Sequence, residues 1–376
     1  MKITGGGSFA QLGNVVNFGD AGSGRSPSLA YDFQGAPWVA YTQDNTGSAN
    51  DRVVVRRFEN GDWQTRGGQV NTTPATTSGF ILSRIAIDGL DRPVVAFVQV
   101  ESAVDKLRVR RLEGSSWVEL GAAPLNVTAG SAQNPMIAMG DQNRPIVAWV
   151  ENGRIRVRRF DPGSSTWLAL GPVEVAFATQ VGLTSFGGVP YLSWGEFTSA
   201  SGNAVNYTVR AARYDEGLNA WVSLISDFRS VTTVNSTSIA VGAVDSPYVA
   251  HSVVPFVPSG APQPQDIRLV RRIAGQYEEV LPLLRVDPAG RATISDTEMI
   301  GASPAVAFNE FNTSGSRIFV RVGLPGGFTI EPATITGATE LGNPDIAANP
   351  STNLANGRLG IVFPRAQGRI AFKKRD

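Results

Sequence analysis

Hydrophobic and polar positions alternate along most of this chain in short runs of four to six residues. The runs are rich in β-branched and aromatic residues, as in PIVAW (145–149) and IRVRRF (155–160), and are separated by turns rich in Gly, Asp, Asn and Pro. A period of two residues is typical of half-buried strands. No segment keeps the helical period of 3.6 over a useful length, so the pattern predicts an all-β protein.

The alternating runs are organised in a sevenfold repeat. A turn of small residues followed by an aromatic residue recurs at spacings of roughly 50 to 56 residues, a period typical of propellers, solenoids and arrays. The seven aromatic residues are Phe9, Trp63, Trp117, Trp167, Trp221, Tyr277 and Phe328.

Each repeat contains four predicted strands, named a to d in chain order. Strand a resembles SIAVG (238–242), and the template places it at ATIS (292–295) in the sixth repeat and at DIAA (345–348) in the seventh. Strand b has the pattern P-x-V-A-aromatic, strand c the pattern V-x-V-R-R-F, and strand d carries the aromatic residue. Between strands b and c of the third repeat, Asn152-Gly153 suits a two-residue type I′ turn, in which both residues have positive φ.

The chain begins and ends out of phase with this repeat. It starts with an isolated strand d (8–17) and stops after a strand c (370–376). We therefore predict a seven-bladed β-propeller of four antiparallel strands per blade, forming a single domain over residues 1–376. Its last blade would consist of residues 343–376 completed by residues 1–17, which closes the ring and leaves no free sheet edge.

The repeat template P-x-[IL]-A-x-D-x-x-G-x-P-x-V-A-[WYF], followed by an aromatic residue before Leu-Gly, resembles that of bacterial exported seven-bladed β-propeller repeat proteins. The resemblance covers essentially the whole chain and implies a kelch-like or propeller-lectin-like architecture. Such propellers have many different activities, so the resemblance implies no particular chemistry. The sialidase Asp box, S-x-D-x-G-x-x-W, does not occur in any repeat.

Composition narrows the function classes. The 33 basic and 32 acidic residues leave a net charge of +1, so we expect no nucleic-acid partner. The chain has no cysteine, and its one histidine, His251, takes the place of a strand b aromatic residue. We expect no metal site and no cofactor, and the lack of a long apolar run predicts no membrane insertion.

Arginine pairs in strand c resemble a basic stripe but have nearby acids. Neighbouring strand residues face opposite sides, so a pair does not form one patch. We expect ion pairs with the acids that follow strand c rather than polyanion binding. The pairs are Arg56-Arg57, Arg110-Arg111, Arg158-Arg159 and Arg271-Arg272.

The candidate binding residues lie near the loops between strands b and c. Polar side chains occur two positions after the strand b aromatic residue, where they would share one rim of the ring. They form either cross-strand pairs, as Glu310 with Arg317, or a polar ring around a binding mouth. The longest b–c loop, 252–266, is proline-rich and carries Phe256, an apolar contact on a stiffened backbone. The candidates are Phe256, Glu196, Glu310, Arg317, Glu151, Gln43 and Gln99.

The function expected from these features is a non-catalytic binding or assembly module that recognises a glycan or protein partner through the face carrying the b–c and d–a loops. No nucleophile motif, phosphate loop or cofactor fingerprint is present. One alternative is a carbohydrate-active hydrolase or lyase that uses rim carboxylates. Another is a structural subunit of a larger surface assembly. Richness in Gly, Ser, Thr, Asn and Pro favours a secreted, periplasmic or cell-surface protein, although the first residues do not resemble a signal peptide. The oligomeric state stays open.

Overall fold

The structure is a computed structural model, which describes sixteen stretches of the chain. They are residues 10–17, 23–44, 51–72, 82–173, 175, 177–201, 204–233, 236–255, 265–273, 275–281, 291–312, 315–324, 327–331, 344–351, 358–365 and 369–375.

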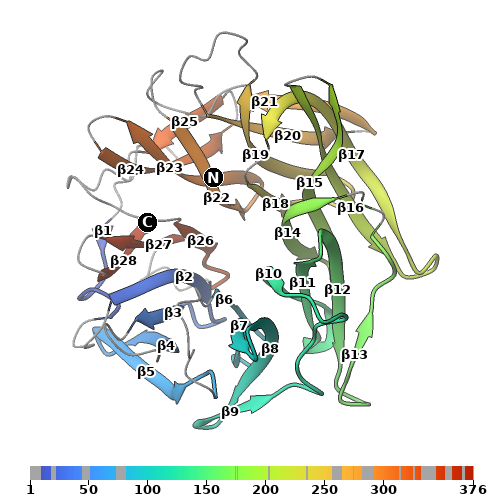
Figure 1. Ribbon diagram of the computed structural model, residues 1–376. Helices are drawn as coiled ribbons and strands as arrows, with labels where there is room; N and C mark the ends of the chain where they lie inside the picture. The colour runs from blue at the N-terminus through green and yellow to red at the C-terminus, as the bar shows by residue number, and fades with distance from the viewer. Residues whose placement is uncertain are drawn as a thin grey trace.

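The fold is a ring of seven blades, each made of four antiparallel strands, which confirms the predicted β-propeller (Figure 1). Blades 1 to 3 are sheets in chain order. Blade 1 contains β2 (Ser23–Tyr31), β3 (Pro37–Asp44), β4 (Arg52–Glu59) and β5 (Asp62–Gln69). Blade 2 contains β6 (Ser83–Ile87), β7 (Pro93–Glu101), β8 (Val104–Glu113) and β9 (Ser116–Glu119). Blade 3 contains β10 (Ala132–Met139), β11 (Pro145–Glu151), β12 (Arg154–Asp161) and β13 (Thr166–Ala169).

Blades 4 to 6 follow the same order, with an added pairing between β17 and β19. Blade 4 contains β14 (Ala178–Phe186), β15 (Val189–Ser201), β16 (Ala204–Asp215) and β17 (Ala220–Thr233). Blade 5 contains β18 (Thr237–Val241), β19 (Pro247–Pro255), β20 (Asp266–Ile273) and β21 (Gln276–Leu281). Blade 6 contains β22 (Arg291–Ile300), β23 (Ser303–Asn312), β24 (Gly315–Leu324) and β25 (Gly327–Glu331). The helical structure in the described residues is a 3-10 turn, η1 (Asp141–Asn143).

Blade 7 joins the two ends of the chain, as predicted. It contains β26 (Asp345–Ala348), β27 (Leu359–Arg365), β28 (Arg369–Arg375) and β1 (Ala10–Gln11), with β1 beside β28 (Figure 1). The contact continues past β1, because the Val16 amide donates to the Ile370 carbonyl at 2.7 Å and the Ile370 amide donates to Asn17 Oδ1 at 2.8 Å. Val16 and Asn17 are fully buried. The N-terminal segment is therefore the outer strand of the last blade.

In three blades the tryptophan of strand d donates a hydrogen bond to the preceding blade. Trp167 Nε1 donates to the Leu120 carbonyl at 2.6 Å, and Trp221 Nε1 donates to the Leu170 carbonyl at 2.7 Å. At the ring closure Trp63 Nε1 donates to the Leu12 carbonyl at 3.3 Å. The glycine after each of these leucines has positive φ, and a Cβ on Gly121 would lie 3.0 Å from Trp167. The Trp and Leu-Gly motifs are thus two halves of one inter-blade contact.

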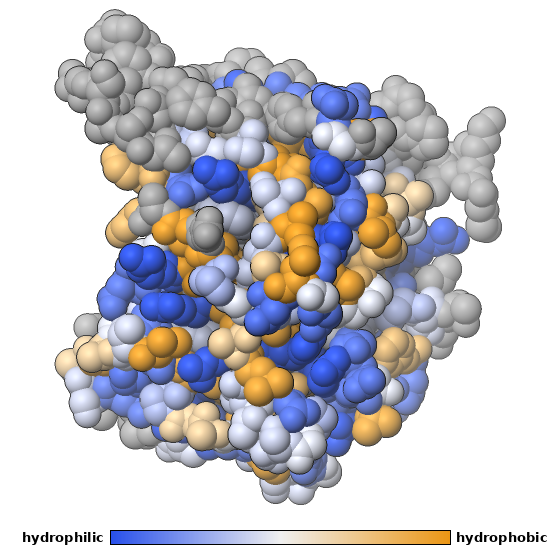
Figure 2. Space-filling view, turned by 90° about the vertical axis from the view of Figure 1, so that its right-hand side faces the viewer, coloured by the Kyte–Doolittle hydropathy of each residue, from blue (hydrophilic) through white to orange (hydrophobic). Residues whose placement is uncertain are grey.

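The core lies between neighbouring blades. Aromatic residues of strand b are fully buried there, including Tyr41, Phe97 and Trp149, as expected from their occurrence at one position of the repeat. Asn152 and Gly153 both have positive φ, which confirms the predicted turn. Figure 2 shows the side of the ring that carries β12, β13, β16 and β17, where hydrophilic and hydrophobic residues are interspersed.

The inner strand of blade 6 differs from the sequence prediction. The sequence template placed strand a at 292–295. In the structure, Asp296 to Met299 pair with the strand b motif of blade 6, as strand a does in the other blades. The register of the pairing shifts between Ile294 and Asp296. The alternating pattern was misread because the true inner residues, Asp296, Thr297 and Glu298, are polar. This shift brings two carboxylates to the centre of the ring.

Candidate functional site

Seven equivalent positions surround the centre of the ring. Each pairs with the fourth residue of the strand b motif of its own blade, so all seven lie at one level of the central channel. In chain order they are Ser28, Arg84, Met136, Gly182, Ser238, Asp296 and Asp345. A second level of residues lies two positions further along each inner strand. Five blades have alanine there, blade 4 has Thr184 and blade 6 has Glu298. Three carboxylates and one guanidinium therefore meet among small side chains.

Asp296 and Asp345 line the same two cavities and hold neighbouring inner strands together. Asp345 Oδ2 accepts from the Leu29 amide at 2.6 Å, and Asp296 Oδ2 accepts from the Ile346 amide at 3.2 Å. The Ser238 hydroxyl donates to Asp296 Oδ1 at 3.2 Å. The pair thus connects blades 5, 6, 7 and 1.

The carboxylates line two connected regions of the channel. A cavity of about 390 Å³ has Asp296, Glu298 and Asp345 in its wall. A second cavity of about 230 Å³ shares Arg84, Asp296 and Asp345 with it and lies where the d–a connectors enter the inner strands. Its wall adds the polar side chains of Asn134, Gln180, Thr237 and Thr293. This end of the channel, where the d–a connectors join the inner strands, is called the channel mouth below.

Burial changes the protonation of these carboxylates. It raises the pKa of Asp296, with further increases from the charges of Asp345 and Glu298. It also raises the pKa of Asp345, against the opposing charge of Arg84. Like charges close together cannot both ionise easily, so each neighbouring carboxylate adds to the effect of burial on the pKa of Asp296. Burial raises the pKa of Glu298 to about 7. Glu298 can therefore donate or accept a proton near neutral pH.

The raised pKa of Glu298 predicts a pH-dependent stability. A carboxyl whose folded pKa lies above its unfolded value stabilises the fold below the unfolded pKa of 4.5, and that contribution is lost as pH rises towards about 7. Since Glu298 is partly exposed, we expect a loss of about 1 to 3 kcal/mol. Glu298→Gln should therefore flatten the dependence of Tm on pH between pH 5 and 8, and should raise Tm at pH 8.

The control for this prediction is Glu278→Gln, which removes an exposed carboxylate that pairs with Arg271. Thermal unfolding of the three proteins across this pH range is the measurement. Equal pH profiles for the wild type and Glu298→Gln would show that Glu298 titrates normally.

The predicted rim residues do not line the channel mouth. Glu151 is fully buried and its carboxylate accepts hydrogen bonds from the Val127 and Thr128 amides, the Thr128 hydroxyl and Trp149 Nε1. These bonds outweigh burial and lower its pKa. Glu151 therefore fixes the connector that leads into blade 3, a structural role.

The other rim candidates are placed in similar surroundings. Gln99, Glu196 and Glu310 are buried; Gln99 donates to Glu101 at 2.7 Å and Glu196 pairs with Arg210. Glu310 faces Arg317 across β23 and β24, as predicted, and Gln43 is partly buried on β3. Phe256 lies outside the described residues. A binding role for these residues stays a prediction.

The channel residues escaped the sequence prediction for two reasons. Asp296 and Glu298 were assigned to the turn after a shorter strand a, and Asp345 was read only as part of DIAA (345–348). A signal was present, because a strand a that is otherwise Ser-Ile-Ala-like carries carboxylates in two consecutive blades.

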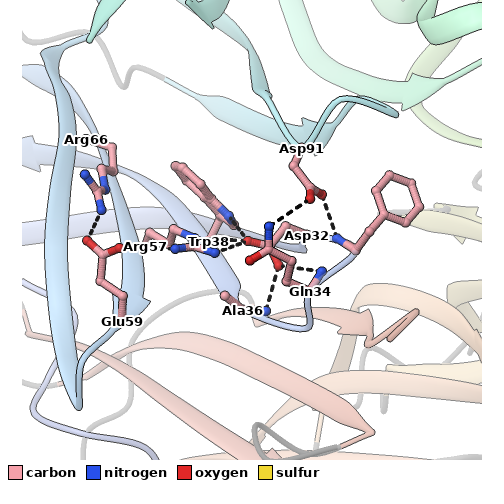
Figure 3. A network of polar contacts seen from close by, with 9 residues as sticks. Asp32, Gln34, Ala36, Trp38, Arg57, Glu59, Arg66 and Asp91 are labelled. Atoms are coloured by element: carbon pink, nitrogen blue, oxygen red, sulfur yellow. Dashed lines mark hydrogen bonds and ion pairs between the residues drawn. The ribbon is translucent and has the colours of Figure 1, made fainter. Parts of the chain in front are cut away.

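A third cavity, of about 330 Å³, lies on the opposite face between blades 1 and 2. Its central acid, Asp32, accepts hydrogen bonds from Trp38 Nε1 at 3.0 Å, from Arg57 Nη2 at 2.8 Å and from the Ala36 amide at 2.8 Å (Figure 3). Asp91 accepts from the Phe33 amide at 2.8 Å and so joins the two blades. These polar groups satisfy one another, so this network stabilises the a–b turns.

Within the stretches that the structure describes, no group of three or more His, Cys, Asp or Glu side chains is arranged to hold a metal ion. None of the described helical structure is long and apolar enough to cross a bilayer.

Comparisons with known proteins identify the fold. No family model and no curated protein matches the sequence. Among solved structures, the polysaccharide lyase Uly1 has a TM-score of 0.59 at 10% identity, over 99% of this chain and 92% of its own. An ulvan lyase of family PL25, bound to -[GlcA(1-4)Rha3S]-, has a TM-score of 0.58 at 11% identity, over 97% and 93%. A prolyl endopeptidase has a TM-score of 0.52 at 13% identity, over 95% of this chain and 50% of its own. Such low identity shows the shared fold alone.

Proposed function

We propose that this protein is a carbohydrate-active enzyme that cleaves a polysaccharide at the channel mouth. The observation that carries the proposal is the cavity in which two carboxyls whose pKa is raised by burial, Asp296 and Asp345, meet Glu298, whose pKa is about 7. Carboxyls tuned to opposite protonation states are the groups that glycoside hydrolysis requires. The proposal takes up the enzymatic alternative from the sequence, with channel carboxylates in place of rim carboxylates.

Asp296 and Glu298 can act on one substrate. They are two residues apart on the same face of β22, and both line the cavity of about 390 Å³. Glycoside hydrolysis uses two carboxyl groups that flank the scissile bond. Asp296 and Asp345 line the same two cavities, so we treat them as one acid–base unit.

The reaction divides between these groups. Protonated Glu298 donates its proton to the glycosidic oxygen as the bond from the sugar C1 to that oxygen breaks. A water molecule attacks C1 and gives its proton to the ionised oxygen of the Asp296–Asp345 pair. The charge of Arg84 opposes the effect of burial on the pKa of Asp345 and favours its ionised form. Hydroxyl and amide side chains of Thr237, Thr293, Asn134 and Gln180 offer hydrogen bonds to the sugar.

Two further features support a polysaccharide substrate. The cavity of about 390 Å³ falls within the range of small-molecule sites, about 300–1,000 Å³. Two of the solved structures with this fold are polysaccharide lyases. Since a polysaccharide substrate would be met outside the cell, we also propose that the protein is exported. The loop-rich face, including Phe256, would contact the sugar chain beyond the cavity.

A panel of neutral and acidic polysaccharides tests the proposal. We expect the purified protein to release new reducing ends from at least one of them, most rapidly below pH 7, where Glu298 is protonated. Binding of these polysaccharides without cleavage would contradict the proposal and would favour a non-catalytic binding module.

A further inference from the structure

Three arginines lie on one face of β12. Arg154, Arg156 and Arg158 occupy alternate positions and face Glu151, Trp149 and Val147 of β11. Because a strand rises about 3.3 Å per residue, their Cα atoms span about 13 Å. Arg154 is exposed, and Arg156 and Arg158 are partly exposed. These three residues are called the blade 3 arginine stripe.

The equivalent stripe of blade 2 is neutralised by acids. Arg108 forms ion pairs with Glu101 at 2.6 Å and with Glu119 at 3.4 Å, and Arg110 pairs with Glu119 at 3.0 Å. Glu119 faces Arg110 across β8 and β9. The same kind of pairing recurs in blade 4, where Arg210 pairs with Glu196, and in blade 5, where Arg268 pairs with Glu279. Strand c arginines on this face are normally compensated.

Blade 3 lacks both acids. Ala169 stands opposite Arg158, where blade 2 has Glu119, and Gly153 takes the place of Glu101. Among the described residues, none forms an ion pair with Arg154, Arg156 or Arg158. Arg156 Nε is buried and makes no hydrogen bond. This departs from the expectation that every arginine pair would find a nearby acid, since Arg159 pairs with Glu216 while Arg158 has no such partner.

Electrostatics favours an anion at this stripe. Burial and the charge of Arg156 lower the pKa of Arg158, against the charge of Glu151. The oxygens of Glu151 are already committed to Thr128, Val127 and Trp149. Within the part of the chain that the structure describes, Glu151 is the one nearby acid that the pKa of Arg158 reflects, and three guanidinium groups share it without forming an ion pair. Partly buried guanidinium groups that lack an ion-pair partner are costly, and a bound anion would relieve that cost.

We propose that the blade 3 arginine stripe binds the carboxylate or sulfate groups of an acidic polysaccharide. A guanidinium fork matches either planar carboxylates or sulfate oxygens with two parallel hydrogen bonds. Nucleic acid fits less well, because the net charge of +1 supplies no extended positive field and the stripe spans one strand only. Arg154 follows the Asn152–Gly153 turn at the end of β11, so the stripe begins on the face of the channel mouth. The stripe is separate from the channel carboxylates, and its binding does not require cleavage.

The test is to restore the acid that blade 2 carries. Ala169→Glu places a carboxylate opposite Arg158 at an exposed position, and Ala169→Gln is the uncharged control of nearly the same size. Binding is measured by affinity electrophoresis at low salt with dextran sulfate, polygalacturonate and neutral dextran. We expect the wild type and Ala169→Gln to bind an anionic polymer but not dextran, and Ala169→Glu to bind at least about tenfold more weakly with Tm unchanged or raised.

Further variants separate the outcomes. Arg156→Gln combined with Arg158→Gln should also weaken binding, whereas Arg108→Gln in blade 2, whose charge is already paired, should not. The tighter of the two anionic polymers identifies the group recognised. Equal binding by Ala169→Glu and Ala169→Gln would overturn the proposal, as would tighter binding to single-stranded DNA or no preference for anionic polymers over dextran. Polysaccharide cleavage that persists in Ala169→Glu would leave the channel proposal intact.

Discussion

Deleting residues 1–17 is expected to lower Tm by more than 10 °C or to prevent folding. The deletion removes the outer strand of blade 7, including fully buried Val16 and Asn17 and their bonds to Ile370. It also removes the Leu12 carbonyl, to which Trp63 of blade 1 donates. Blades 7 and 1 would both lose contacts, and an unpaired edge of β28 would be exposed to aggregation. Thermal unfolding of the two chains is the measurement.

Adding the missing strand back in trans distinguishes closure from general damage. A peptide of residues 8–17 should bind the shortened chain and recover part of the lost Tm, whereas a peptide of the same composition in scrambled order should not. An unchanged Tm after the deletion would show that the ring does not depend on this strand.

Asp345→Asn is expected to reduce polysaccharide cleavage by about 10²- to 10⁴-fold, the range that general acid–base groups contribute. Asparagine keeps an oxygen that can accept from the Leu29 amide, so the inner strands stay connected, but the side chain can no longer take up a proton. The loss should fall on kcat more than on KM. In the wild type, activity should decline above about pH 7, where Glu298 loses its proton. Glu298→Gln should remove most of the activity that the wild type shows below that pH.

Asp141→Ala serves as the control for these variants. Asp141 is exposed on the opposite face, in η1, and pairs with Arg144. Its removal should leave cleavage unchanged. If Asp345→Asn lowered Tm but left kcat and the pH profile as in the wild type, Asp345 would hold the inner strands together without taking part in chemistry.

The architecture could be predicted because its signals repeat. The aromatic residue and the Leu-Gly pair, as in Trp167 and Gly121, recur in the sequence at a fixed period, and in three blades they form an inter-blade contact. The phase of the two ends indicated the closure by β1. Each of these features depends on many residues, so one irregular blade does not hide it.

The site could not be predicted in the same way, because it departs from the repeat. Asp296 and Glu298 lie in a strand whose register is shifted, and sequence alone does not give the register of an irregular strand. Glu151 looked like a rim carboxylate, but its role is set by Thr128 and Val127, which lie more than twenty residues earlier in the chain. Whether a polar side chain faces a cavity or a connector depends on such contacts.

The most direct test of the proposed site is a crystal structure of Asp345→Asn with an oligosaccharide from whichever polysaccharide the wild type cleaves. The proposal predicts sugar density in the channel mouth, with the glycosidic oxygen within hydrogen-bond reach of Glu298 and the ring near Asp296 and Arg84. Sugar bound only on the opposite face, or on the outer strands with the channel mouth empty, would contradict it.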